Sequence, residues 1–147
     1  MVKSYGIFVL MLIFGNAAAQ EVFRVPAHFR SLGDASVSLQ SPLSLFSNPA
    51  GFVNESTLAF GIQYEKRFLL NELSTSSAFV VLPVVTTNFG FSFSQFGQGL
   101  YQENKLSFAV AKKLSGRVQA GLQFHYFDLN LPENRTHAAT LMVDLGL

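Results

Sequence analysis

Apolar and polar residues alternate along most of the chain after residue 55. The clearest case is the stretch 117–127, in which every second position is apolar and the positions between are polar or small. The apolar set is Val118, Ala120, Leu122, Phe124 and Tyr126, and the other set is Arg117, Gln119, Gly121, Gln123 and His125. A period of two is typical of a β-strand that buries one face. The pattern predicts a strand with two chemically different faces.

Other stretches of the chain show the same pattern. Residues 56–65, 88–96, 104–112 and 139–147 alternate clearly, and residues 74–83 do so less regularly. The apolar positions of the four regular stretches are Leu58, Phe60, Ile62, Tyr64, Phe89, Phe91, Phe93, Leu106, Phe108, Val110, Leu141, Val143, Leu145 and Leu147. We therefore expect an all-β fold, an antiparallel up-and-down meander of about six strands, preceded by a short helical and turn segment.

The second face of these strands carries Gly, Ala, Ser and Gln more often than the Lys, Glu and Thr of a water-facing sheet. That composition is typical of a confined interior. Beyond the N-terminus the longest apolar run, residues 78–85, is too short to cross a bilayer as a helix. Strands that face lipid on one side hide their apolar residues among polar ones. Residues 56–147 are therefore predicted to form part of a transmembrane β-barrel. The alternative is a soluble periplasmic β-sandwich, because any half-buried antiparallel sheet alternates in this way.

The connections between the predicted strands support the barrel. Those at 67–73, 97–103 and 130–135 are long, and those at 84–87 and 113–116 are short. Outer-membrane barrels have short periplasmic turns and longer external loops. Aromatic residues also gather toward the long connections, where an interfacial girdle is expected. They are Tyr64, Phe68, Phe96, Tyr101, Tyr126 and Phe127.

The first residues have the parts of a secretory signal peptide. Lys3 supplies the positive charge, residues 7–14 form a short apolar core, and the small residues 17–19 precede the expected cleavage after Ala19. The apolar core is far shorter than the ~20 residues that a membrane-spanning anchor helix needs. Residues 1–19 are thus predicted to be a signal peptide, and the mature protein is expected in the cell outer membrane.

Residues 20–55 are predicted to form a plug-like segment that packs inside or beneath the strands. Ser41 and Pro42 are typical of the N-cap and first position of a short helical turn, and residues 48–51 of a β-turn. This structural motif is Asn48, Pro49, Ala50 and Gly51. The prolines prevent one long helix, and the apolar residues are too frequent for a free tail. The residues expected to contact an apolar ligand or to hold the plug are Phe23, Phe29, Leu43, Phe46 and Phe52.

Composition excludes several kinds of chemistry. The 147 residues include sixteen Phe, no Cys and a formal net charge of +1, so neither disulfides nor a basic surface for nucleic acid is expected. The histidines His28, His125 and His137 lack the spacing of metal ligands. Asp144 and Glu65 are expected to point inward, where Arg117 is their expected partner. No catalytic residue, cofactor or metal is predicted, and the protein is not expected to be an enzyme.

Two stretches, HFRSLGDASVSLQSPLSLFSNPAGFVNESTLAFGIQYE and QFGQGLYQENKLSFAVAKKLSGRVQAGLQFHYF, carry a family resemblance. They resemble the N-terminal portion of the PorV/PorQ-like outer-membrane barrels of Bacteroidetes, which are related to the long-chain fatty acid transporters. The matching residues are Arg30, Gly33, Ala35 and the turn 48–51, whereas Asp34 stands where the family often has a smaller residue. The resemblance covers roughly residues 27–147 and implies a non-enzymatic barrel.

Two functions follow from this resemblance. The first is a component of type IX secretion or of protein attachment at the outer membrane, working through protein partners and surrounded by membrane lipid. The second is a transport barrel for hydrophobic small molecules such as fatty acids. Single-chain outer-membrane barrels have at least ~8 strands, so about six strands will not close. We therefore expect a fragment of a barrel, or a subunit whose barrel another chain completes.

Overall fold

The computed structural model describes residues 40–99, 101–116, 118–131 and 136–147. A short 3₁₀ helix, η1, comes first, and a series of β-strands follows it. Two further 3₁₀ turns, η2 and η3, connect the first two strands. The elements are η1 (Pro42–Phe46), β1 (Ala59–Lys66), η2 (Arg67–Leu69), η3 (Asn71–Leu73), β2 (Ser74–Val84), β3 (Thr87–Phe96), β4 (Gln102–Lys113), β5 (Gln119–Leu131) and β6 (Thr136–Gly146).

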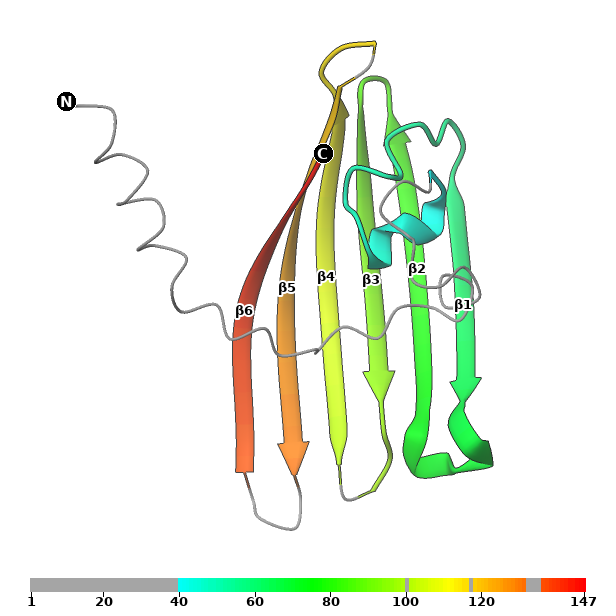
Figure 1. The fold of residues 1–147 in the computed structure, drawn as a ribbon, viewed down its shortest axis with the longest axis vertical. Coiled ribbons are helices and arrows are strands. Elements are labelled where there is room, and N and C mark those ends of the chain that lie inside the picture. The colour runs from blue at the N-terminus through cyan, green and yellow to red at the C-terminus, as the bar shows by residue number, and fades with distance from the viewer. Residues whose placement is uncertain (1–39, 100, 117, 132–135) are drawn as a thin grey trace, which may run out of the picture.

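All six strands belong to one antiparallel sheet in the order β1-β2-β3-β4-β5-β6 (Figure 1). Each strand pairs with its neighbours in sequence, and the sheet does not close on itself. The prediction of an all-β, up-and-down meander is therefore confirmed, including the less regular strand at 74–83. The predicted signal peptide and the part of the predicted plug-like segment before residue 40 lie outside the described residues.

The two faces of the sheet differ as the alternation predicts. On the first, which we call the apolar face, the register aligns Phe60, Val80, Phe91, Phe108, Phe124 and Val143 in one row across all six strands. On the second, which we call the covered face, the next row contains Gly61, Phe79, Ser92, Ser107, His125 and Met142. One register therefore separates a continuous hydrophobic surface from a mixed, polar one.

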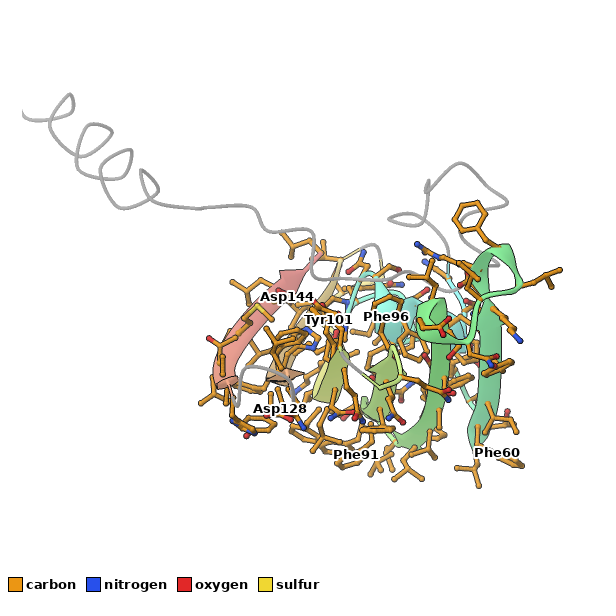
Figure 2. All side chains as sticks on the ribbon, turned by 90° about the horizontal axis from the view of Figure 1, so that it is seen from below. Phe60, Phe91, Phe96, Tyr101, Asp128 and Asp144 are labelled. Atoms are coloured by element: carbon orange, nitrogen blue, oxygen red, sulfur yellow. The ribbon has the colours of Figure 1, made fainter. Side chains whose placement is uncertain are left out.

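The N-terminal segment packs against the covered face. η1 lies over β2 and β3, near the end of the sheet that carries the β2–β3 turn (Figure 1). Viewed from below, the sheet is curved, with this segment on its concave side (Figure 2). Phe60 and Phe91 lie along the opposite, convex side. The described part of the chain before the strands therefore packs on one face of the sheet.

The expected alternation of long and short connections is wrong in part. β4 ends at Lys113 and β5 begins at Gln119, so residues 114–118 form a connection as long as residues 97–101 between β3 and β4. The expected long connections at 97–103 and 130–135 are shorter, because residues at their ends pair within strands. Gln102 lies opposite Asn130, and Leu131 opposite Thr136. The longest connection, at 67–73, and the shortest, at Val85 and Thr86, still lie at opposite ends of the sheet.

The aromatic residues expected in a girdle divide between the two faces of the sheet. Tyr64 and Tyr126 lie on the apolar face, in the rows of Ser76 and of Leu106. Phe96 and Phe127 instead share the covered face with Thr75 and Lys105. Phe96 and Phe127 lie near the ends of their strands, as the sequence predicted. Adjacent residues of a strand point to opposite faces, so an odd position differs from its even neighbour in the face that it occupies.

Candidate functional site

The covered face holds a seat for the turn at residues 48–51. Gly90, Gly121 and Gly146 lie on three strands beneath the N-terminal segment, and a Cβ atom at any of them would overlap an atom of that segment. At Gly121 the overlap is with the backbone of Pro49, and at Gly146 with the Asn48 side chain. Glycine is needed at Gly121 and Gly146 because the backbone of residues 49 and 50 approaches the strands closely, whereas at Gly90 the overlap is with the side chains of Leu45 and Phe52. We call these three residues the glycine seat.

The turn in this seat has the geometry that its sequence predicts. The amide of Gly51 donates to the carbonyl of Asn48 at 3.0 Å, which closes a β-turn. The Asn48 side-chain oxygen accepts from the amide of Ala50 at 3.0 Å. Both bonds lie within a buried part of the segment. Asn48 to Gly51 therefore form a compact corner that joins the segment to the sheet, as the motif predicted.

Amide side chains from the sheet bind the carbonyls of the N-terminal segment. The Asn88 side-chain nitrogen donates to the carbonyls of Phe52, Val53 and Glu55 at 2.9, 3.0 and 2.8 Å. The Gln123 side-chain nitrogen donates to the carbonyl of Leu45 at 2.9 Å. Asn88 and Gln123 are both buried. These bonds matter because a backbone carbonyl that is buried away from water without a hydrogen-bond partner costs about 1–3 kcal/mol of folding free energy.

Apolar side chains complete the contact. The largest buried cluster brings segment residues together with the covered face. It consists of Leu45, Phe52, Val53, Val81, Ala109 and Ala111. Phe46 packs edge-on against Phe79, with ring centroids 5.9 Å apart. Small residues on the strands leave room for large ones on the segment, so the two parts interlock.

Of the residues predicted to contact an apolar ligand or to hold the plug, two lie at this contact. Phe46 and Phe52 are buried between segment and sheet, and Phe52 is 0% exposed. Leu43 is half-buried in η1. Phe23 and Phe29 lie outside the described residues. Phe46 and Phe52 thus pack between the segment and the sheet.

A row of polar side chains crosses the covered face beside the N-terminal segment. The Ser107 hydroxyl lies 2.7 Å from Nδ1 of His125, and Nε2 of the same ring lies 3.0 Å from a carboxylate oxygen of Asp144. A neutral His125 that carries its proton on Nε2 donates to Asp144 and accepts from Ser107. Lys105, also buried, interacts electrostatically with Asp144. The row thus balances charge within the sheet.

The residue types of a hydrolytic triad are present in Ser107, His125 and Asp144. Access to a substrate and an oxyanion hole are absent there. Ser107 is only 1% exposed and His125 only 3%. β4 is paired along both edges, so the amides around Ser107 are used by the sheet and cannot form an oxyanion hole. The arrangement pairs polar side chains from three neighbouring strands.

The charged residues expected to meet inside have other partners. Asp144 contacts His125, and Glu65 contacts Nε of Arg67 at 3.1 Å. Arg117 lies outside the described residues, as does His28. His137 lies 2.7 Å from a carboxylate oxygen of Asp128, on the apolar-face side of the strands. Among the described residues no group of His, Asp and Glu could hold a metal ion.

The apolar face is the second candidate site, as an interaction surface. Its edge residues are among the most exposed apolar side chains, with Ile62 at 90%. The row of aromatic rings at its centre continues from Phe91 to Phe108, whose centroids lie 4.9 Å apart. Water-exposed monomers rarely show so large an apolar surface. We therefore expect this surface to be covered by a partner or by an apolar medium.

In the part of the chain that the structure describes, no helix is long and apolar enough to cross a membrane. Comparisons with known proteins give no relative: no family model, no curated protein and no solved structure matches this chain.

Proposed function

We propose that this chain forms part of the wall of an outer-membrane β-barrel and that it works there as a non-enzymatic, PorV/PorQ-like component of protein secretion or attachment. The observation that carries the proposal is the apolar face. Transmembrane β-strands alternate between lipid-facing apolar residues and lumen-facing polar ones. In this sheet the apolar residues of all six strands share one face in a common register, although β2 also carries Phe79 and Val81 on the covered face.

The ends of the apolar face support a membrane setting. Toward the β3–β4 connection the apolar residues of β3, β4 and β5 give way to Gln95, Asn104 and Asp128, which form one row. Toward the other end they give way to Thr87 and Lys112, which also lie opposite each other. A band of apolar residues with polar borders fits the finite thickness of a bilayer. A β-sandwich would instead require a second sheet to cover this face, and the described residues form one sheet.

The covered face favours a function through protein partners over the transport of apolar molecules. Transport would need open apolar space around Leu43, Phe46 and Phe52, but the two phenylalanines fill the contact between segment and sheet. The rest of the face carries Ser92, Ser107 and other buried polar groups, which suit a polar lumen. We therefore rank a plugged barrel acting through protein partners above a fatty acid channel.

Cysteine labelling in intact cells tests the location and the orientation. The β2–β3 turn lies at the end where the N-terminal segment packs, and an exported chain enters the outer membrane from the periplasm. We expect Gln98→Cys to react with a membrane-impermeant maleimide in intact cells, and Val85→Cys to react only after permeabilisation. Both positions are exposed in the structure. If only Val85→Cys reacts in intact cells, the proposed orientation is wrong. If the protein is recovered in the soluble fraction, the proposed barrel is wrong.

A second measurement separates the two functions. A pull-down from solubilised outer membranes, read beside a titration with a fluorescent fatty acid, should recover specific protein partners and show no saturable fatty acid binding. Saturable binding that Phe52→Ala abolishes, without any recovered partner, would favour the transport barrel.

A further inference from the structure

The apolar face carries a groove where its hydrophobic band ends. The groove has a volume of about 470 Å³ and lies over β3, β4 and β5. Its apolar wall is the row Phe93, Leu106 and Tyr126, and its polar wall is the next row, Gln95, Asn104 and Asp128, with Gln102 beside it. Adjacent rows on one face lie about 7 Å apart, so one small molecule spans both. We call this feature the boundary groove.

The polar wall of the boundary groove is rich in amides and poor in cations. None of the residues that line it is Lys or Arg. Its one carboxylate, Asp128, lies 2.7 Å from Nε2 of His137. An anionic phosphate would meet this carboxylate without the guanidinium or ammonium group that phosphate sites use. The polar wall therefore disfavours an anionic phospholipid head group.

Amide and carboxylate groups in this arrangement suit hydroxyl groups instead. Gln and Asn side chains each donate and accept hydrogen bonds, and a carboxylate accepts from hydroxyls. Sugar rings combine hydroxyl groups at their edges with C–H faces that pack on aromatic rings, and Tyr126 and Phe93 supply such rings at the border. The acyl chains of the same molecule would continue over Leu106 into the apolar band.

On these grounds we propose that the boundary groove binds a membrane glycolipid, with its sugar against Gln95, Gln102, Asn104 and Asp128 and its acyl chains against Phe93, Leu106 and Tyr126. This inference rests on the proposed membrane location of the apolar face. It adds a lipid class and a binding site to that location. The groove lies at one border of the apolar band, so the glycolipid occupies the leaflet on the side of the β3–β4 connection.

The test uses the full mature chain and two lipids that share their acyl chains. The protein is reconstituted in vesicles of equal parts monoglucosyl diacylglycerol and phosphatidylglycerol, transferred to mild detergent, and analysed by native mass spectrometry for the lipids it retains. With about two hydrogen bonds gained by the sugar, we expect roughly tenfold preferential retention of the glycolipid. Asn104→Leu should remove most of this preference. Thr87→Leu, the matched change at the opposite border of the same face, should leave it intact.

The outcomes separate this inference from the proposed function. If the wild-type protein inserts into the vesicles but retains both lipids equally, or prefers phosphatidylglycerol, the groove is a general lipid contact and the inference is wrong. The same conclusion follows if Asn104→Leu retains the full preference. If the wild-type protein does not enter the vesicles at all, the membrane location fails and the inference fails with it. The comparison of the two lipids retained by the wild-type protein tests the inference even if a variant does not fold.

Discussion

The two faces of the sheet are built from alternate residues of the same strands, yet their surroundings differ. On the covered face, Asn88, Gln123 and His125 are buried and hydrogen-bonded. On the apolar face, Phe60 and Ile62 are largely exposed, and Phe60 lies on the convex side of the sheet (Figure 2). The first face obtains its partners from within the chain. On the second face, many apolar side chains of the described residues are exposed, so its stability depends on what surrounds the protein.

The largest expected effect comes from placing a charge on the apolar face. Phe124→Arg puts a cation at the centre of this face, and we expect it to reduce the stability of the bilayer-inserted protein by about 2–4 kcal/mol. Ala120→Arg lies on the same face of β5 but nearer its end, where the cost falls to about 0–1 kcal/mol. Urea unfolding in lipid vesicles measures both. Equal and small effects would mean that this face contacts water.

The next effect concerns the glycine seat on the covered face. Gly121→Ala adds a methyl group where the backbone of Pro49 lies, and overpacking of this kind costs about 1–3 kcal/mol. Gly116→Ala is the control, because no atom lies within 4 Å of its added Cβ. Reactivity of a cysteine at the buried Phe52 reports release of the N-terminal segment. We expect faster labelling with Gly121→Ala only. Unchanged labelling would show that the segment is not held by the seat.

The smallest effect compares two neighbouring serines. The hydroxyl of Ser77 lies 3.0 Å from that of Ser94 on the covered face, whereas Ser76 is exposed on the apolar face. We expect Ser77→Ala to destabilise the protein by about 1 kcal/mol and Ser76→Ala to be neutral or slightly stabilising in vesicles. If urea unfolding shows that both variants lose the same free energy of unfolding, the proposed difference between the two faces is wrong.

The sequence predicted the strands because a period of two is a local property. Phe60, Ile62 and Tyr64 alternate with Gly61 and Gln63 within one short stretch, so each strand and its two faces could be read without knowledge of its neighbours. The ends of the strands were predicted less well. Gln102 and Asn130 look like loop residues in isolation, and only their mutual pairing places them in strands.

The polar row and the glycine seat could not be predicted in this way. Ser107, His125 and Asp144 come from three strands, and their meeting depends on the register between them. The alternation did place all three on the non-apolar face, which was the available signal. Gly121 and Gly146 were visible as small residues, but their role requires the approach of a segment that is distant in sequence. The turn at 48–51 was predicted because its chemistry is local.

The central claim, that the apolar face contacts lipid, is tested most directly by spin labels placed one at a time at residues 88–94 of β3 in the reconstituted protein. Phe89, Phe91 and Phe93 lie on the apolar face, and Asn88, Ser92 and Ser94 on the covered face. We predict that collision with oxygen, which concentrates in the bilayer, peaks at residues 89, 91 and 93, while collision with a water-soluble nickel complex is lowest there. High nickel accessibility at Phe91 would contradict the account, because it would place the centre of the apolar face in water.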